Sequence, residues 1–146
     1  MKKYFFQLFE HEYWANLSVL EIYFKSQNPP ERAIILMSHV IATQRVWLDR
    51  IKGNEMVVES FEIFEDEALL ELLEINHIEL LRLINEVDFE QLFTYQNTKD
   101  KHFTKNAENT LTHLALHASY HRGQLVTLLK SDENPVVETD FIHYVS

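Results

Sequence analysis

Histidines are the residues of this chain with the clearest potential for chemistry. The sequence has eight histidines and no cysteine. His113, His117 and His121 follow one another at intervals of four residues. Residues four apart on an α-helix share a face, with Cβ atoms about 5–6 Å apart, so that a neighbouring pair can chelate one metal ion. Without cysteine, a transition metal has only histidine and carboxylate side chains as ligands.

The spacing alone leaves open which two of these histidines form the pair. The outer two, His113 and His121, are about 12 Å apart along a helix axis and about 80° apart around it, so all three cannot easily bind one ion. We therefore expect the third ligand from another helix. His39 is the best candidate, because it lies in the otherwise apolar segment 36–41, where an unpaired imidazole is costly. The alternative for any one histidine is a hydrogen-bonded core residue.

Two further metal motifs are incomplete. His11-Glu12 would begin the His-Glu-x-x-His motif of zinc proteases, but position 15 is Ala15. Glu74 and His77 match one Glu-x-x-His half of a di-iron helical bundle, and the sequence has no second copy. We therefore discard both motifs and expect a solvated carboxylate at Glu74 and a surface histidine at His77.

Four segments with helical hydrophobic periodicity would position these residues. The expected helices are Tyr4–Phe24, Glu31–Lys52, Asp66–Glu86 and Ala107–Lys130. Asn28-Pro29-Pro30 separates the first two, and Gly53-Asn54 favours a helix end after the second. The polar segment 87–106 is expected to be a loop or short hairpin around Asn97-Thr98-Lys99-Asp100. Because so long a connection is unusual, it is either a missed element or a functional covering segment.

Four amphipathic helices of this length can bury their apolar faces together in a four-helix bundle. We therefore expect an all-α fold and a single domain over residues 1–146, since no repeat or linker divides the sequence. Roughly 68–70% of the unfolded chain's surface is hidden at this length, so the chain needs no disulfide to fold.

Charge and hydropathy exclude several partners. The chain has 13 lysines and arginines against 23 aspartates and glutamates, a net charge of −10, which opposes binding to nucleic acid or anionic lipid. The longest strongly apolar run, Ala33–Met37, is far short of the roughly 20 residues of a membrane-spanning helix. The N-terminal segment lacks the features of an export signal, so a cytoplasmic location is expected.

The last expected helix carries a specific motif. Its run Leu116-His117-Ala118-Ser119-Tyr120-His121-Arg122-Gly123-Gln124-Leu125 resembles the His-x-x-x-His-Arg-Gly-Gln signature of the DinB/YfiT-like family of metalloenzymes, named for DNA-damage inducibility. The resemblance covers nearly the whole chain, since it extends to Tyr13-Trp14-Ala15-Asn16, to Ser38-His39-Val40 through Trp47-Leu48, and to residues 135–144.

This resemblance implies an up-down-down-up four-helix bundle, usually dimeric, with a divalent metal bound by one histidine of the second helix and two of the last. On this sequence the implied ligands are His39, His117 and His121, which leaves His113 outside the site. It also implies that residues 135–144 form an ordered strap against the bundle. Zinc, nickel, copper, iron or manganese would suit the site, and the ligands do not select among them.

Several relatives are metal-dependent transferases or isomerases that use low-molecular-weight thiols. The resemblance therefore implies a metal-activated thiolate that attacks a small electrophilic substrate. Three neutral imidazoles leave positions on the ion open to water or substrate, as in reactive sites. The alternatives are a non-catalytic, stress-associated bundle that binds metal or a partner, and a plain helical protein whose histidine site holds no metal.

Arg122 has two readings, an anion-binding residue or a structural ion pair, and we favour an ion pair, with Asp140 of the tail as the partner. Gly123 costs about 1 kcal/mol relative to alanine inside a helix, so we expect close approach by a neighbouring helix or the tail. Tyr120, Gln124 and Gln44 are candidates to orient the ligand rings, but most of them are expected to be ordinary interface or surface residues. Trp14, Trp47, Phe5 and Phe9 are candidates to line a pocket, but we expect them to be core residues instead.

Overall fold

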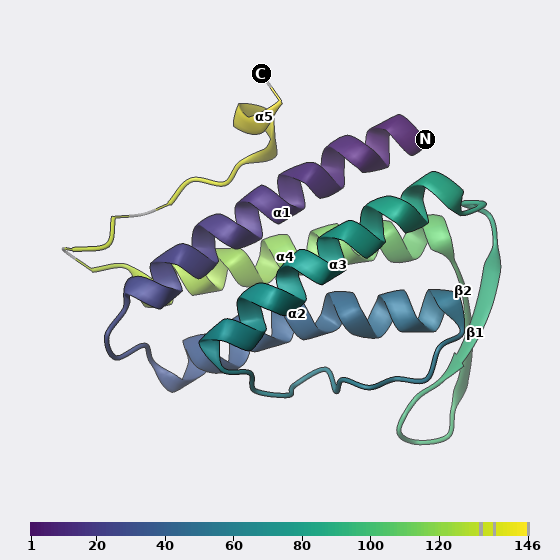
Figure 1. Cartoon of the computed structure of the whole chain (residues 1–146), viewed down its shortest axis with the longest axis horizontal. Coiled ribbons are helices and arrows are strands. Elements are labelled where there is room, and N and C mark those ends of the chain that lie inside the picture. The colour runs from purple at the N-terminus through teal and green to yellow at the C-terminus, as the bar shows by residue number, and fades with distance from the viewer. Residues whose placement is uncertain (132, 136, 146) are drawn as a thin grey trace.

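The computed structural model, which describes residues 1–131, 133–135 and 137–145, is mostly helical (Figure 1). Its long helices are α1 (Lys2–Lys25), α2 (Glu31–Lys52), α3 (Asp66–Glu86) and α4 (Ala107–Leu129). The smaller elements are the strands β1 (Leu92–Gln96) and β2 (His102–Asn106) and the short helix α5 (Phe141–Tyr144). The all-α expectation holds for most of the chain, and segment 87–106 contains the expected hairpin.

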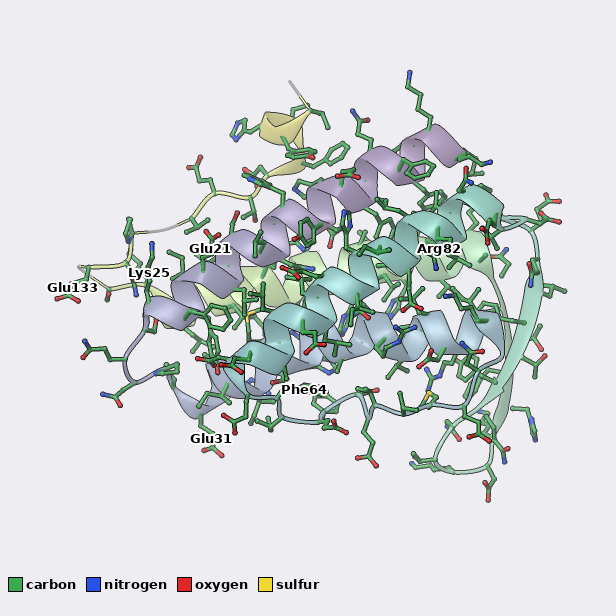
Figure 2. All side chains as sticks on the ribbon, viewed as in Figure 1. Glu21, Lys25, Glu31, Phe64, Arg82 and Glu133 are labelled. Carbon is green, nitrogen blue, oxygen red and sulfur yellow. The ribbon has the colours of Figure 1, made fainter. Side chains whose placement is uncertain are left out.

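Local sequence explains where these helices begin and end. Gly53 adopts a φ of 70°, the left-handed conformation that glycine tolerates, and α2 ends there. The side chain of Asn106 accepts a hydrogen bond from the backbone N–H of Asn109 at 2.8 Å and so caps the start of α4. The charged side chains labelled in Figure 2, such as Glu21 and Lys25, are exposed, whereas the apolar faces are buried.

Two clusters of buried side chains hold the helices together, and each cluster contains residues of all four long helices. Phe5 and Phe9 are each 1% exposed and belong to one of these clusters, as expected of core aromatics. Trp14 differs, since it is 37% exposed and its ring lies 5.3 Å from that of Tyr144. The helices thus form a common core.

The hairpin packs on one end of the helices. Its register pairs Phe93 with Lys105 and Tyr95 with Phe103. Residues paired across two strands share a face of the sheet, and so do alternate residues along one strand. Phe93 is 8% exposed and packs into a core cluster, so this face is the one turned toward the helices.

The C-terminal strap lies along α1 (Figure 1). His11 of α1 donates a hydrogen bond from Nε2 to the backbone oxygen of Thr139 at 2.6 Å. The His11 ring also makes edge contacts with the rings of Phe141 and Tyr144. The expected strap is therefore seen at these residues, while Val136, which falls in the same expectation, is outside the described residues.

Within the described parts of the chain, every helix is too short or too polar to be a membrane-spanning segment.

Candidate metal centre

His39 of α2 and His117 and His121 of α4 meet between the two helices. Each offers a ring nitrogen, and these nitrogens all lie within 4.8 Å of one another. The Nε2 atoms of His39 and His117 are 3.1 Å apart. His39 is buried and the other two are half-buried. The structure thus brings together the three histidines that the family motif implies, and His113 is not part of the group.

Two of the three rings are oriented by a hydrogen bond on the side away from the group. His39 donates from Nδ1 to the backbone oxygen of Ser60 at 2.7 Å. His121 donates from Nδ1 to Oε1 of Gln124 at 2.7 Å. Each bond places the ring proton on Nδ1 and leaves the Nε2 lone pair free, which is the arrangement typical of histidine ligands. This donor set fits a divalent cation, and of the three candidates to orient a ring, Gln124 is the one that contacts a histidine of the group.

The connection between α2 and α3 covers one side of His39. The ring of Phe61 stacks on the His39 ring, with centroids 4.0 Å apart and planes within 4°. The backbone N–H of Phe64 donates to Oγ of Ser38 at 3.1 Å and holds the connection against α2. Sequence reasoning considered segment 87–106 as a cover and overlooked this one, for which the only sequence signal was the length of the connection between the second and third helices.

Burial keeps the central imidazoles uncharged. Burial, together with the nearby His121, His39 and His113, lowers the pKa of His117 from 6.5 to about 4, and burial makes the largest contribution. Burial also lowers the pKa of His39, although the hydrogen bond to Ser60 acts in the opposite direction. These two rings are therefore neutral at pH 7, and the neutral imidazole is the form that binds metal.

The pKa of His117 predicts a pH dependence of stability. Its value is 6.5 in the unfolded chain and about 4 in the folded protein. Between these values the unfolded chain binds more protons, so the free energy of unfolding of the metal-free protein falls as the pH is lowered from 6.5 toward 4. His117→Gln removes this contribution, and its stability should decline less steeply. Urea unfolding of both metal-free proteins across this range is the measurement, and equal slopes would contradict the assignment.

The histidines of the discarded motifs have structural contacts. His11 holds the strap, and its Nδ1 lies 3.6 Å from Oε1 of Glu12. The His77 ring stacks on that of Tyr13, with centroids 4.1 Å apart, so it is half-buried rather than at the surface as expected. Glu74 is exposed, as expected. Among the described residues, neither motif belongs to a group that could hold a metal ion.

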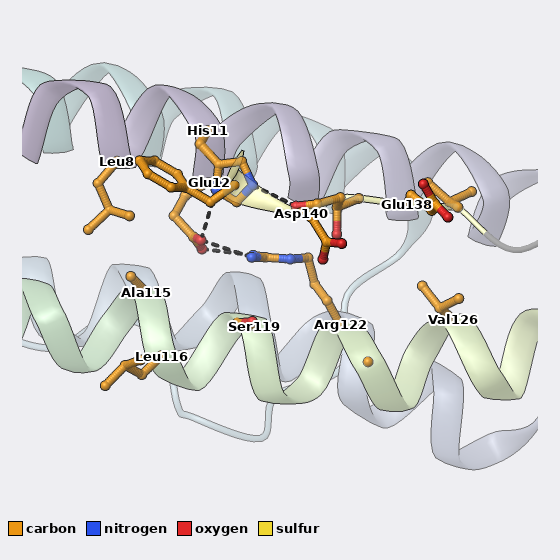
Figure 3. Close-up of a pocket in the computed structure, with 14 residues that line it drawn as sticks. Leu8, His11, Glu12, Ala115, Leu116, Ser119, Arg122, Val126, Glu138 and Asp140 are labelled. Atoms are coloured by element: carbon orange, nitrogen blue, oxygen red, sulfur yellow. Dashed lines mark hydrogen bonds and ion pairs between the residues drawn. The ribbon is translucent and has the colours of Figure 1, made fainter. Parts of the chain in front are cut away.

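Arg122 forms the expected ion pair, but its partner is Glu12 rather than Asp140 (Figure 3). Its Nη1 and Nη2 donate to the two Glu12 carboxylate oxygens at 2.7 and 2.9 Å, and Nη1 also donates to Oδ1 of Asn16 at 2.8 Å. Arg122 and Glu12 are each 3% exposed. One sequence signal pointed to Glu12, because it lies on the same helix face as the core residues Phe5 and Phe9.

The expectation for Gly123 was wrong. A Cβ atom at this position would meet no described atom within 4 Å, so no neighbouring helix or tail segment requires the glycine. Tyr120 is 68% exposed, as expected of a surface residue. Gln44 is buried, and its Oε1 lacks a hydrogen-bond partner in the described structure.

Comparison with known proteins identifies one family. The model of the DinB superfamily matches residues 11–125, a span that contains the three histidines, Glu12 and Arg122. Neither the search of curated proteins nor that of solved structures found a significant match.

Proposed function

This chain belongs to the DinB superfamily, and from that premise we propose that it is a metal-dependent enzyme. In this proposal His39, His117 and His121 hold one divalent cation. The reaction transfers a low-molecular-weight thiol to a small electrophilic substrate. Zinc, nickel, iron and manganese are all compatible with three imidazoles, and availability in the cell contributes to the choice.

The convergence of three imidazole nitrogens within 4.8 Å is the observation that carries the proposal. A bound divalent ion supplies Lewis acidity, which lowers the pKa of a coordinated thiol or water and makes it a nucleophile near neutral pH. With only three protein ligands, coordination positions remain for substrate.

The chain's own residues prepare this site. Ser60 and Gln124 hold the rings of His39 and His121 with their lone pairs turned inward. Phe61 lies flat on His39 and keeps water from one face of that ring. These contacts fix the ligands before substrate arrives, and such preorganisation is what a reactive metal site needs.

We further propose that α1–α4 form an up-down-down-up bundle within one domain. One core cluster joins the start of α1 and the start of α4 to the ends of α2 and α3. The other cluster joins the opposite halves. This pairing supports a bundle in which α1 and α4 run one way and α2 and α3 run the other. In this proposal His39 and the histidines of α4 lie near the middle of the bundle.

We also propose that two copies pair through the outer face of α4, over its part from Leu116 to Thr127. The exposed residues of this helix carry no charge, in a chain with a net charge of −10; they are Asn109, Thr112, His113, Leu116, Ser119, Tyr120, Gly123 and Thr127. Two such chains repel one another least where the facing surfaces are uncharged. Gly123 supports the same face, because its cost inside a helix is offset if a partner helix approaches closely there.

Leu116→Glu tests this face. Leu116 is 66% exposed, and a carboxylate there should raise the dissociation constant of the dimer at least tenfold, or about 1.4 kcal/mol. Ile142→Glu is the matched control, since Ile142 is 68% exposed but lies outside α4. Sedimentation equilibrium measures both. A monomeric wild-type protein at tens of micromolar, or equal effects of the two variants, would contradict the proposed interface.

The competing function is a non-catalytic bundle that binds metal or a partner. Activity separates the two. Protein purified without a histidine tag is loaded with metal and assayed for conjugation across a panel of low-molecular-weight thiols and electrophiles. We expect turnover that chelation abolishes and metal restores. Retained metal without metal-dependent turnover would favour the non-catalytic bundle and remove the enzyme proposal.

A further inference from the structure

A pocket of about 390 Å³ lies beside the three-histidine group, between α2, α4 and the hairpin. It is lined by Trp47, Tyr95, Lys105, Asn109, Thr110 and His113. The centroid of the His113 ring is 5.7 Å from that of Trp47 and 5.5 Å from that of His117. The His113 ring thus lies between a molecule in the pocket and His117, one of the proposed metal ligands.

The hairpin turns a lysine toward this pocket. Lys105 pairs with Phe93 and therefore shares the helix-facing side of the hairpin with Phe93, Tyr95 and Phe103. Thr94, by contrast, is on the outer side with its partner across the hairpin. The other three residues on this face are aromatic, so an apolar residue is expected at position 105. The chain has a lysine there, and this lysine lines the pocket.

A second cation, Arg50, lies against the Trp47 and Tyr95 rings and has no acidic partner among the described residues. The guanidinium carbon of Arg50 lies 4.6 Å from the Trp47 ring centroid and 4.3 Å from that of Tyr95. Arg50 is half-buried, its Nε has no hydrogen-bond partner in the part of the chain that the structure describes, and burial lowers its pKa. None of the ion pairs among the described residues includes Arg50 or Lys105. Partial removal of a cation from water costs free energy, and a bound anion would offset this cost.

The walls of the pocket suit a flat ligand. The Trp47 and Tyr95 rings meet nearly at right angles, at 84°, with centroids 5.2 Å apart. Two perpendicular rings accept a third ring by face and edge contact together. The volume of about 390 Å³ is within the range of small-molecule sites.

We propose that this pocket binds a small aromatic carboxylate, with its ring against Trp47 and Tyr95 and its carboxylate on Lys105. Arg50, stacked on both rings, adds positive charge where the surroundings are poorly hydrated. The inference rests on the proposed function, for which it names the substrate class: an organic anion whose reactive end reaches past His113 toward the three histidines.

Benzoate and the uncharged benzamide are the probes. Trp14→Phe leaves Trp47 as the single tryptophan, because the chain has two. Metal-free protein is titrated with each compound at constant ionic strength, which excludes coordination of benzoate to a metal. We expect quenching of Trp47 fluorescence, with benzoate bound at least tenfold more tightly than benzamide. Lys105→Gln should remove this preference, whereas Lys105→Arg and the control Lys99→Gln, at the exposed hairpin turn, should keep it.

Equal affinity for the two probes, no binding of either, or equal losses in Lys105→Gln and Lys99→Gln would overturn the proposal. Metal retention is measured separately on the same preparations. A chain that retains metal but shows no preference for benzoate loses the pocket and keeps the proposed function. A chain that shows the preference but retains no metal loses the proposed function and keeps the pocket.

Discussion

Alanine at His39, His117 or His121 is expected to weaken metal binding by more than a hundredfold each. Loss of a residue that only orients a ligand already costs 10–100-fold, and loss of a ligand removes a bond to the ion as well. The measurement is metal content after gel filtration of untagged protein, followed by competition with a chelator. All three variants should emerge with little metal, while the wild-type protein retains a near-stoichiometric amount.

His113→Ala is the matched control for this experiment. His113 is on the same helix, and its ring lies 5.5 Å from that of His117, but it is not among the three converging nitrogens. We expect this variant to retain most of its metal. Equal loss in all four variants would refute the choice of ligands, and retention in His39→Ala would show that the site does not span α2 and α4.

The second large effect concerns stability. Arg122→Met should lower the free energy of unfolding by about 3–5 kcal/mol, because it leaves the Glu12 carboxylate buried without its cation. Glu12 is 3% exposed and accepts two hydrogen bonds from Arg122. The double variant Glu12→Leu/Arg122→Met, which removes both charges, should recover most of this loss. Urea unfolding of the single and double variants measures the difference.

Arg82→Met provides the matched control, since Arg82 is exposed on α3 (Figure 2) and should change stability by less than about 0.5 kcal/mol. The double variant should also retain metal, because both Nη groups of Arg122 donate to Glu12 and Asn16 and neither contacts one of the three proposed ligands. Arg122→Met with unchanged stability, or a double variant as unstable as the single one, would contradict a structural role.

The helices could be predicted because each carries an apolar face of helical period, and α2 is also bounded by Pro30 and Gly53. The bounds of α2 and α3 agree with expectation at both ends. Helix α1 is longer than expected in its first and last turns, and α4 ends one residue earlier than expected. Asn76 is an exception on the buried face of α3, where its side chain donates to the backbone oxygen of Ile41 at 3.0 Å. A buried hydrogen bond thus places a polar residue where hydrophobic spacing favours an apolar one.

Contacts between distant segments could not be predicted in the same way. The motif on α4 indicated His117 and His121, but nothing local paired Arg122 with Glu12, a contact across 110 positions of sequence. The role of Gln124 depends on a rotamer of His121, and that of Ser60 on the path of the α2–α3 connection. Sequence patterns report the period of an element reliably, and they report its partners only where a motif has been seen before.

Ser60 and Phe61, which orient the His39 ring, belong to the connection between α2 and α3, a stretch of chain without regular structure. The orientation of a proposed metal ligand therefore depends on this connection. Adding or deleting one residue between Gly53 and Phe64 would shift which carbonyl meets the imidazole, and would rotate that ring without altering any histidine. Reactivity in such a protein can therefore diverge through changes in linker length alone, while the helical scaffold and every coordinating side chain stay the same.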